Sequence, residues 1–315
     1  MDRSARILIT GASGMVGAAT LKLFEAKGYT NISSPTRNEL DLLDQAAVLK
    51  YFDLRRPEYV FMIAAKVGGI AANLADPVGF LDQNMRMTLN LFAACHRFRT
   101  RKNLFLGSSC IYPRECRQPM RESDLLTGPL EVTNEAYALA KITGLKLAAY
   151  YEHQYGLKTV CLMPCNIYGS GDHFDLQNSH VLSSLVRRFV DARDAGAEMV
   201  TLWGTGQARR EFLHVDDVAL AILFFINALD NSKPINVGSG SDVSILELAN
   251  LIACHVGFKG GIHWDKQKPD GMPRKCLDVS EMTNMGFRPA VSLGDGILRM
   301  IKEYETYKSE GLIKP

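Results

Sequence analysis

A loop with three glycines follows the first predicted strand, and it constrains the fold more than any other feature. Residues 6–10 form a short apolar run, Gly11-Ala12-Ser13-Gly14-Met15-Val16-Gly17 follows, and helical spacing begins within this loop. An isolated match to this glycine spacing is weak, but a strand before it and a helix after it are the context of a dinucleotide-binding fold. The glycines allow a tight turn close to a pyrophosphate, which amides at the helix N-terminus then bind. This pattern predicts dinucleotide contacts at Gly11, Ser13, Gly14, Met15, Val16 and Gly17.

The first half of the chain alternates short apolar runs with longer helical patterns. Strands are predicted at residues 6–10, 59–63, 103–106 and 159–163, and helices at residues 16–27, 78–98 and 137–155. Strands that alternate with helices indicate a parallel sheet covered on both faces. We therefore predict an α/β fold with a doubly wound, parallel Rossmann sheet.

After Gly169 the pattern changes to shorter elements. Helices are predicted at residues 181–195, 215–229 and 245–256, with a strand at 199–203. A chain of 315 residues exceeds one compact core. We predict an NADP-binding Rossmann domain at residues 1–169 and a smaller α/β substrate domain at 170–315, with some later segments returning to the first domain.

Composition excludes several classes of protein. The formal charge is +2, far from the excess that nucleic-acid binding demands, and no apolar run reaches the roughly 20 residues of a membrane span. The predicted strand at residues 6–10 leaves no room for a signal peptide, so a cytoplasmic location is expected. Seven scattered cysteines without a C-x-x-C spacing suggest neither a disulfide framework nor a metal site.

The residues about 20 positions beyond the glycine loop indicate the type of dinucleotide. An NAD enzyme usually places an acid there for the ribose hydroxyls, whereas this chain reads Ser33-Ser34-Pro35-Thr36-Arg37. Arg37 can form a bidentate pair with a 2'-phosphate, which favours NADP(H). An exposed surface arginine is the alternative interpretation.

A serine, a tyrosine and a lysine follow the strand at residues 103–106. Gly107-Ser108 comes directly after it, and Tyr137 and Lys141 are four residues apart, so they share a helix face. A lysine cation and a nearby cofactor should lower the pKa of the tyrosine from about 10. Tyr137 could then exchange a proton with a substrate oxygen, to which Ser108 donates a hydrogen bond.

Several longer segments narrow the interpretation, and they resemble one enzyme family. They are Ala64-Ala65-Lys66-Val67-Gly68-Gly69-Ile70, Leu106-Gly107-Ser108-Ser109-Cys110-Ile111-Tyr112-Pro113, Asn178-Ser179-His180-Val181, Arg210-Glu211-Phe212-Leu213-His214-Val215-Asp216-Asp217 and Lys268-Pro269-Asp270-Gly271-Met272-Pro273-Arg274-Lys275. With the glycine loop and the Tyr137/Lys141 pair, they resemble the GDP-L-fucose synthase family of extended short-chain dehydrogenases/reductases. The resemblance covers nearly the whole chain.

The resemblance implies a multifunctional oxidoreductase and isomerase of GDP-fucose biosynthesis. Its substrate would be GDP-4-keto-6-deoxy-D-mannose, epimerised at carbons 3 and 5 and then reduced at carbon 4 by NADPH. Cys110 and His180 would be the acid and base of the epimerisation, because inverting a carbon needs one group on each face. A small buried thiol is the alternative for Cys110, and a capping or surface residue is the alternative for His180.

The resemblance also implies further contacts and a partner. Expected cofactor contacts beyond the glycine loop and Arg37 are Leu42, Ala64, Leu106, Gly107, Lys141, Pro164, Asn166, Ile167 and His180. Expected substrate contacts are Arg188, Trp203, Arg210 and Asp270, with a choice between Arg209 and Arg210 left open and a solvated position as the alternative for Arg188. A homodimer joined through the helices at residues 78–98 and 137–155 is expected.

One segment departs from the family pattern. The family commonly has Pro-Thr-Asn and a Gly-Pro-His-Asp-Asn-Phe loop, where this chain has Pro164-Cys165-Asn166 and Gly169-Ser170-Gly171-Asp172-His173-Phe174. A related GDP-4-keto-deoxy or dideoxy sugar, or a heptose, is therefore an alternative substrate. An NAD-dependent sugar-nucleotide 4-epimerase or 4,6-dehydratase is a further alternative, although a dehydratase needs an acidic pair where Ser109-Cys110 stands. A redox-sensing or scaffold protein without turnover is the third alternative function.

Overall fold

A six-stranded parallel sheet forms the centre of the larger lobe. The computed structural model describes residues 1–175, 180–268 and 272–312. The strands lie in the order β2 (Ile32–Ser33), β1 (Ile7–Thr10), β3 (Tyr59–Met62), β4 (Lys102–Leu106), β5 (Thr159–Pro164) and β9 (Pro234–Val237). Every neighbouring pair is parallel. The predicted doubly wound Rossmann sheet is confirmed.

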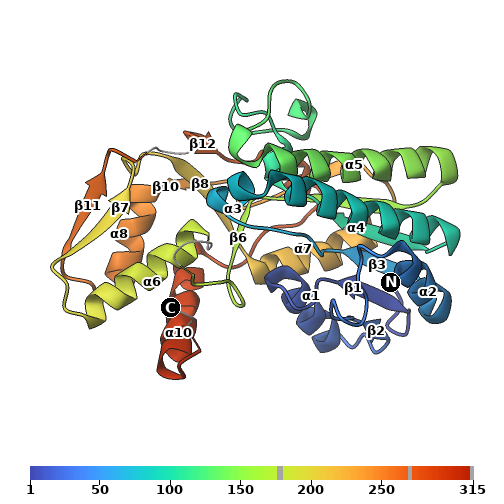
Figure 1. Cartoon of the computed structure of the whole chain (residues 1–315), viewed down its shortest axis with the longest axis horizontal. Coiled ribbons are helices and arrows are strands. Elements are labelled where there is room, and N and C mark those ends of the chain that lie inside the picture. Colours follow the sequence, from blue (N-terminus) through green and yellow to red (C-terminus); the bar gives the residue numbers. More distant parts are fainter. Residues whose placement is uncertain (176–179, 269–271, 313–315) are drawn as a thin grey trace.

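Helices cover both faces of this sheet, as Figure 1 shows. On one face α1 (Met15–Ala26) packs against α7 (Val215–Ala228), and on the other α4 (Pro77–Arg97) packs between α2 (Gln45–Arg55) and α5 (Glu135–Tyr155). All residues of β1, β3 and β5 are buried, which explains their continuous apolar runs. The predicted helices at these positions are confirmed to within a few residues.

The order of the strands places a ligand-binding crevice at one edge. The connection from β1 leads outward to β2, and the next returns across β1 to β3, so the direction of winding reverses between β1 and β3. Ligands of doubly wound sheets bind beyond the carboxyl ends of the strands at such a point. The glycine loop lies at the carboxyl end of β1.

The smaller lobe contains short strands and three helices around a second hydrophobic core. β6 (Asn166–Tyr168), β8 (Arg209–His214), β10 (Asp242–Ser244) and β12 (Arg274–Lys275) form one small sheet, and β7 (Met199–Trp203) pairs in parallel with β11 (Gly261–Asp265). The core lies among α6 (Val181–Asp194), α8 (Ile245–Val256) and α10 (Leu293–Ser309). Shorter elements are α3 (Ile70–Ala75), α9 (Ser280–Asn284) and the 3₁₀ turns η1 (Ser109–Ile111), η2 (Glu122–Asp124) and η3 (Val132–Asn134).

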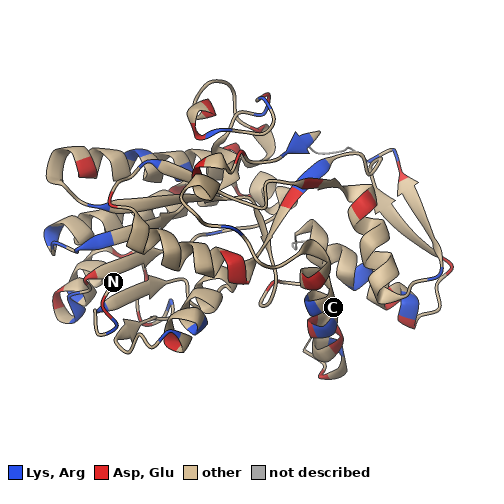
Figure 2. Ribbon diagram, turned by 180° about the vertical axis from the view of Figure 1, so that it is seen from behind, with Lys and Arg blue, Asp and Glu red and all other residues tan. Residues whose placement is uncertain are grey.

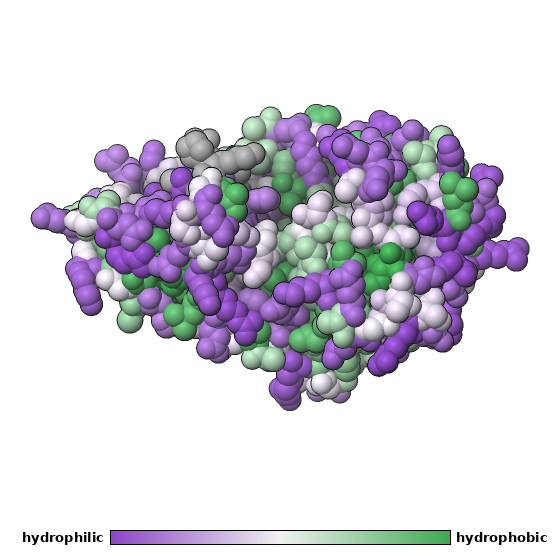
Figure 3. Space-filling view, turned by 90° about the horizontal axis from the view of Figure 1, so that it is seen from below, coloured by the Kyte–Doolittle hydropathy of each residue, from purple (hydrophilic) through white to green (hydrophobic). Residues whose placement is uncertain are grey.

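Charged residues of both signs are spread over the surface of the molecule. Basic and acidic segments are interspersed over both lobes in Figure 2. Seen from below, hydrophilic residues cover most of the margin and hydrophobic residues gather toward the middle of that face (Figure 3). None of the helices in the described ranges is long and apolar enough to cross a bilayer.

Candidate active site

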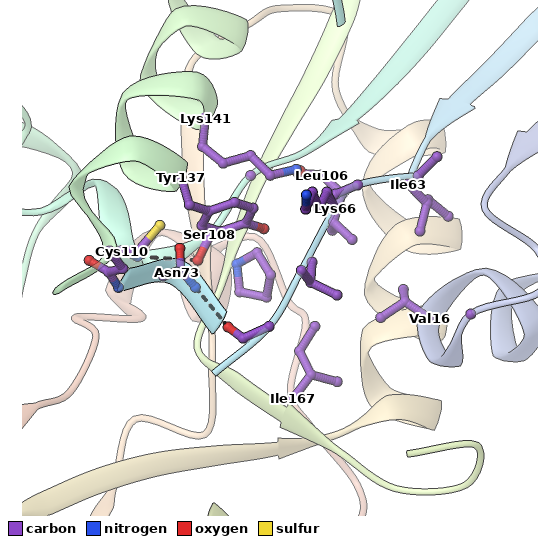
Figure 4. Close-up of a pocket in the computed structure, with 18 of the residues that line it drawn as sticks. Val16, Ile63, Lys66, Asn73, Leu106, Ser108, Cys110, Tyr137, Lys141 and Ile167 are labelled. Atoms are coloured by element: carbon purple, nitrogen blue, oxygen red, sulfur yellow. Dashed lines mark hydrogen bonds between the residues drawn. The ribbon is translucent and has the colours of Figure 1, made fainter. Parts of the chain in front are cut away.

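One cleft of about 1280 Å³ lies at the carboxyl ends of the large sheet's strands and collects most of the predicted site residues. The predicted residues that line it are Gly11, Ser13, Gly14, Met15, Val16, Gly17, Arg37, Leu42, Ala64, Leu106, Gly107, Ser108, Cys110, Tyr137, Lys141, Pro164, Asn166, Ile167, His180 and Arg210. Figure 4 shows several of these side chains around a shared space. Residues far apart in sequence therefore face one cavity.

The glycine loop packs so tightly against its own backbone that side chains at two of its positions would clash. Gly11 has a φ of 74°, and a Cβ there would lie 2.8 Å from the backbone of Ala64. A Cβ on Gly17 would lie 2.1 Å from the carbonyl oxygen of Gly11. Gly14 precedes α1 without a side-chain cap, so the first amides of this helix remain available. The loop fits a pyrophosphate at the helix N-terminus.

Arg37 lies exposed at the rim of the same cleft, beyond β2. The nearby carboxylate of Glu39 is engaged by Thr36, whose backbone N–H and hydroxyl both donate to it. Glu39 does not line the cleft, whereas the acidic Asp41 does, and the guanidinium of Arg37 is a cation that can pair with a 2'-phosphate at this end.

The end of β4 brings Ser108 and Cys110 into the cleft. A Cβ on Gly107 would lie 2.3 Å from the sulfur of Met163 and 3.2 Å from the carbonyl oxygen of Leu162, so a larger residue would need the Met163 side chain to move. The hydroxyl of Ser108 accepts a hydrogen bond from the backbone N–H of Cys110 at 3.2 Å, which caps η1. This capping bond fixes the spacing between the two side chains.

Tyr137 and Lys141 share one face of α5, as the spacing predicts. The Lys141 ammonium lies 5.6 Å from the centre of the Tyr137 ring and donates to the carbonyl oxygen of Leu106 at 2.7 Å. Burial lowers the pKa of Lys141 to about 8. Burial also raises the pKa of Tyr137 above its usual value. Burial and the nearby Cys110 both act in this direction, so the protein groups alone do not lower the Tyr137 pKa, and the lowering expected with a bound cofactor stays a prediction.

Cys110 is buried, and two lysines oppose the effect of its burial. Desolvation raises the pKa of the Cys110 thiol, whereas the positive charges of Lys275 and Lys141 favour its thiolate. Lys275 comes from β12 of the small lobe and lines the cleft. Its own pKa is lowered, chiefly by burial. The cysteine is therefore placed in an electropositive setting, which favours proton exchange.

His180 enters the cleft from the small lobe. It is exposed, precedes α6 without capping it through its side chain, and its carbonyl accepts from the backbone N–H of Ser184 at 3.0 Å. The divergent loop before it is anchored, because the N–H of Gly171 donates to Glu303 at 2.9 Å and the buried Asp172 accepts from Ser183. The capping alternative for the imidazole of His180 is therefore wrong.

The structure separates the two adjacent arginines of β8. Arg209 forms ion pairs with Asp242 and Glu247, whereas Arg210 lines the cleft and donates to the carbonyl oxygen of Arg209 at 2.8 Å. Arg210 is therefore the arginine that faces the cleft.

Two predicted substrate contacts, Arg188 and Trp203, do not line the cleft, and a third is not among the described residues. Arg188 lies half-buried on α6, where it donates to the hydroxyl of Ser184 at 3.4 Å, and it does not line the cleft. Trp203 is 67% exposed at the end of β7, with Lys268 at 5.6 Å from its ring. Asp270 lies outside the described residues.

Sequence reasoning missed several residues of the cleft. Lys275 belongs to a segment that carries the family resemblance, but its role was not inferred, because nothing local shows that β12 approaches Cys110. Asn73 and Asn134 also line the cleft, from α3 and η3. The only sequence signal for Asn73 was its place just after the Ala64–Ile70 segment that carries the family resemblance.

Comparisons with known proteins agree with this arrangement. The model of the NAD dependent epimerase/dehydratase family matches residues 7–238. GDP-L-fucose synthase 1 of Arabidopsis thaliana is 47% identical over 94% of this chain and 92% of its own length, and the GDP-L-fucose synthase of Escherichia coli (strain K12) is 46% identical over 93% and 94%.

A solved structure agrees as well. A GDP-D-glycero-L-gluco-heptose synthase from Campylobacter jejuni, crystallised in the presence of NADPH, superposes with a TM-score of 0.89 at 31% identity, covering 97% of this chain and 99% of that one. The chain thus belongs to the NAD dependent epimerase/dehydratase family and, within it, to the GDP-L-fucose synthases.

Proposed function

We propose that this chain is an NADPH-dependent 3,5-epimerase/4-reductase that converts GDP-4-keto-6-deoxy-D-mannose to GDP-L-fucose. The observation that carries the proposal is one cleft that holds a dinucleotide loop, a Ser108/Tyr137/Lys141 group, and the pair Cys110 and His180. The near-half sequence identity to GDP-L-fucose synthases over almost the whole chain supports it. Reduction and epimerisation need these two sets of groups around one carbonyl.

The residues present fit NADP(H). Gly11 and Gly17 let the loop fold tightly on its own backbone, the uncapped N-terminus of α1 would bind the diphosphate, and Arg37 supplies a cation for the 2'-phosphate. Lys141, which lines the cleft and is anchored on Leu106, would hold the cofactor's ribose hydroxyls. When bound, the cofactor supplies the hydride that reduces carbon 4.

Tyr137 and Ser108 act on the oxygen of carbon 4. Both hydroxyls can donate hydrogen bonds to the carbonyl, and Tyr137 gives its proton as the oxygen becomes a hydroxyl. The charge of Lys141 limits the cost of the phenolate that remains, so that the proton can be replaced from solvent. The three residues together polarise the carbonyl and complete the reduction.

The same polarised carbonyl assists epimerisation. Hydrogens on carbons 3 and 5 are acidic because their loss gives an enolate, which Tyr137 and Ser108 stabilise through its oxygen. One of Cys110 and His180 removes a proton from one face, and the other returns a proton to the opposite face. These side chains come from different lobes, so the sugar would lie between them.

A related GDP sugar is the second candidate substrate. The divergent loop at residues 169–174 leads to His180, and in this chain Gly171 adopts a φ of 84° where the family commonly has histidine. A dideoxy or heptose substrate would use the same carbonyl chemistry. A 4,6-dehydratase is not favoured, because Ser109-Cys110 stands where its acidic pair is needed, and the complete Ser108/Tyr137/Lys141 group disfavours a scaffold without turnover.

A homodimer in the cytoplasm completes the proposal. Helices α4 and α5 lie side by side (Figure 1) and carry exposed large apolar side chains, namely Val78, Leu89, Leu139, Tyr150 and Tyr155. A second copy would cover them. Light scattering should give twice the chain mass, and Tyr150→Lys should shift it toward one chain mass; a monomeric wild type would contradict the dimer. The cytoplasm is where a charged nucleotide sugar and NADPH are jointly accessible.

Product analysis tests the function directly. The purified protein is incubated with NADPH and GDP-4-keto-6-deoxy-D-mannose, and the product sugar is identified by NMR. The expected product is GDP-L-fucose, formed with one NADPH oxidised per sugar. Reduction without inversion at carbons 3 and 5, or no turnover, would contradict the proposal.

A further inference from the structure

Asn73 carries an unpaired amide oxygen in the wall of the cleft. The side chain is 6% exposed, and its Nδ2 donates to the carbonyl oxygens of Gly68 and Gly69 at 2.9 and 3.0 Å. These two donations identify which end of the amide is nitrogen, since two carbonyl oxygens can accept only from N–H. Among the described residues, nothing donates to Oδ1.

A buried carbonyl oxygen without a partner calls for an explanation. Most such groups in native proteins are paired, because water can no longer satisfy them. A flip of the Asn73 amide would not give Oδ1 a donor, because it would place Oδ1 against the carbonyl oxygens of Gly68 and Gly69. The oxygen is thus held in place as an acceptor, and a bound ligand is a source of the missing donor.

Asn73 lies at the end of the cleft where the reaction would occur. In Figure 4 it is on the side of Ser108 and Cys110, away from Val16 and Ile63 at the dinucleotide end. A second unpaired oxygen, that of Asn134, lines the same cleft from η3, which packs against α3. This end of the cleft therefore offers acceptors in addition to the donors around the carbonyl.

Few groups of a GDP-4-keto-6-deoxy sugar can donate to such an acceptor. The 4-keto oxygen, the ring oxygen and the diphosphate carry no hydrogen, and the guanosine lies beyond the diphosphate. The hydroxyls on carbons 2 and 3 remain, and of these only the C3 hydroxyl is on a carbon that flanks the carbonyl. If Ser108 and Tyr137 hold the oxygen of carbon 4, an acceptor on the side of Cys110 meets the hydroxyl of carbon 3.

We propose that Asn73 Oδ1 accepts a hydrogen bond from the C3 hydroxyl of the bound 4-keto sugar, and that Asn73 selects substrates that carry this hydroxyl. The inference rests on the proposed function and names a specificity residue of the same site. Oδ1 is shielded from bulk water, so the proposed hydrogen bond requires a local movement of the cleft wall when the sugar binds. Once formed, the bond has little competition from solvent.

The test measures each substrate with each enzyme variant, so that the effects of the sugar hydroxyl and of Asn73 can be compared. NADPH oxidation is followed with the parent 4-keto sugar, with its 3-deoxy analogue and with its 2-deoxy analogue, for wild type and Asn73→Ala. Wild type should prefer the parent over the 3-deoxy analogue by about tenfold or more in kcat/KM, because losing the hydroxyl leaves the oxygen unpaired. In Asn73→Ala this preference should fall to within about twofold, since the acceptor is gone.

Two further variants separate recognition from loop structure. Asn84 holds the same loop, accepting from the backbone N–H of Lys66 at 2.8 Å and donating to its carbonyl at 3.0 Å, but it does not line the cleft. Asn84→Ala should lower activity on the parent and the 3-deoxy analogue equally. Asn73→Asp keeps an acceptor but sets a second oxygen against the carbonyls of Gly68 and Gly69, so activity on every sugar should fall, and the preference for the hydroxyl should remain in the activity that is left.

The outcomes distinguish failure of this inference from failure of the proposed function. Equal losses on both sugars in Asn73→Ala would make Asn73 a loop residue only. A wild type that does not distinguish the parent from the 3-deoxy analogue, or that discriminates against the 2-deoxy analogue instead, would overturn the C3 assignment while the function stands. A wild type that turns over none of the three sugars would overturn the proposed function itself.

Discussion

The ammonium of Lys141 lies 5.6 Å from the centre of the Tyr137 ring while it donates to the carbonyl oxygen of Leu106 at 2.7 Å. Leu106 is the last residue of β4, so the lysine ties α5 to the strand that presents Ser108. Burial raises the pKa of Tyr137 and lowers that of Lys141 to about 8. The charge state of Lys141 near neutral pH should therefore control how readily Tyr137 gives up its proton.

A pH profile of the reduction tests this relationship. Lys141 is charged below its pKa and neutral above it, so kcat/KM should fall as pH rises through about 8. Lys141→Met should lower kcat/KM at pH 7 by about 100-fold or more and remove this alkaline limb. An unchanged limb in Lys141→Met would show that another group titrates there.

Arg37 should determine the choice between NADPH and NADH. Arg37→Ala removes a charge-assisted pair worth about 1.5–3 kcal/mol, so NADPH binding should weaken by about 10- to 150-fold while NADH binding changes little. Fluorescence titration of both cofactors measures the effect. Arg55→Ala, which removes an exposed arginine of α2 that does not line the cleft, is the matched control. Equal losses for both cofactors would exclude Arg37 from the phosphate site.

Lys275 should lower the pKa of Cys110. Its charge favours the thiolate against burial, so Lys275→Met should shift the pH dependence of deuterium exchange at the sugar carbons toward higher pH. At pH 7.5 the exchange rate should fall by about tenfold. Lys66→Met is the control, because Lys66 also lines the cleft but is paired with Asp76. If the pH profile of deuterium exchange did not shift in Lys275→Met, Lys275 would not influence the Cys110 thiol.

Most of the large sheet could be predicted because its strands are local, continuous apolar runs. β1, β3, β4 and β5 were all identified within two residues. β2 has only two residues, and β9 begins with a proline and contains a polar Asn236, so neither has a strand pattern of its own. β9 is a strand because it pairs with β5, an interaction between distant segments that periodicity does not show.

Some residues of the candidate site could likewise be placed from local sequence patterns, and others could not. Gly11, Ser108 and Tyr137 follow predicted strands or lie on predicted helices, so topology alone placed them at one edge of the sheet. Lys275 and Asn73 reach the cleft only through tertiary packing, which local patterns do not encode. The rise in the Tyr137 pKa without cofactor depends on the same packing, because burial is its main cause.

The central claim is that one cleft performs epimerisation and reduction with separable groups. Deuterium incorporation from heavy water at carbons 3 and 5 is measured beside NADPH oxidation for wild type, Tyr137→Phe and Cys110→Ser. Tyr137→Phe should lose at least about 100-fold in reduction while exchange persists to the extent that Ser108 holds the enolate oxygen. Cys110→Ser should still oxidise NADPH but with exchange strongly reduced, because serine is too weak an acid to replace the thiol. Wild-type exchange at both carbons in Cys110→Ser would contradict the account, since Cys110 would then serve only in packing.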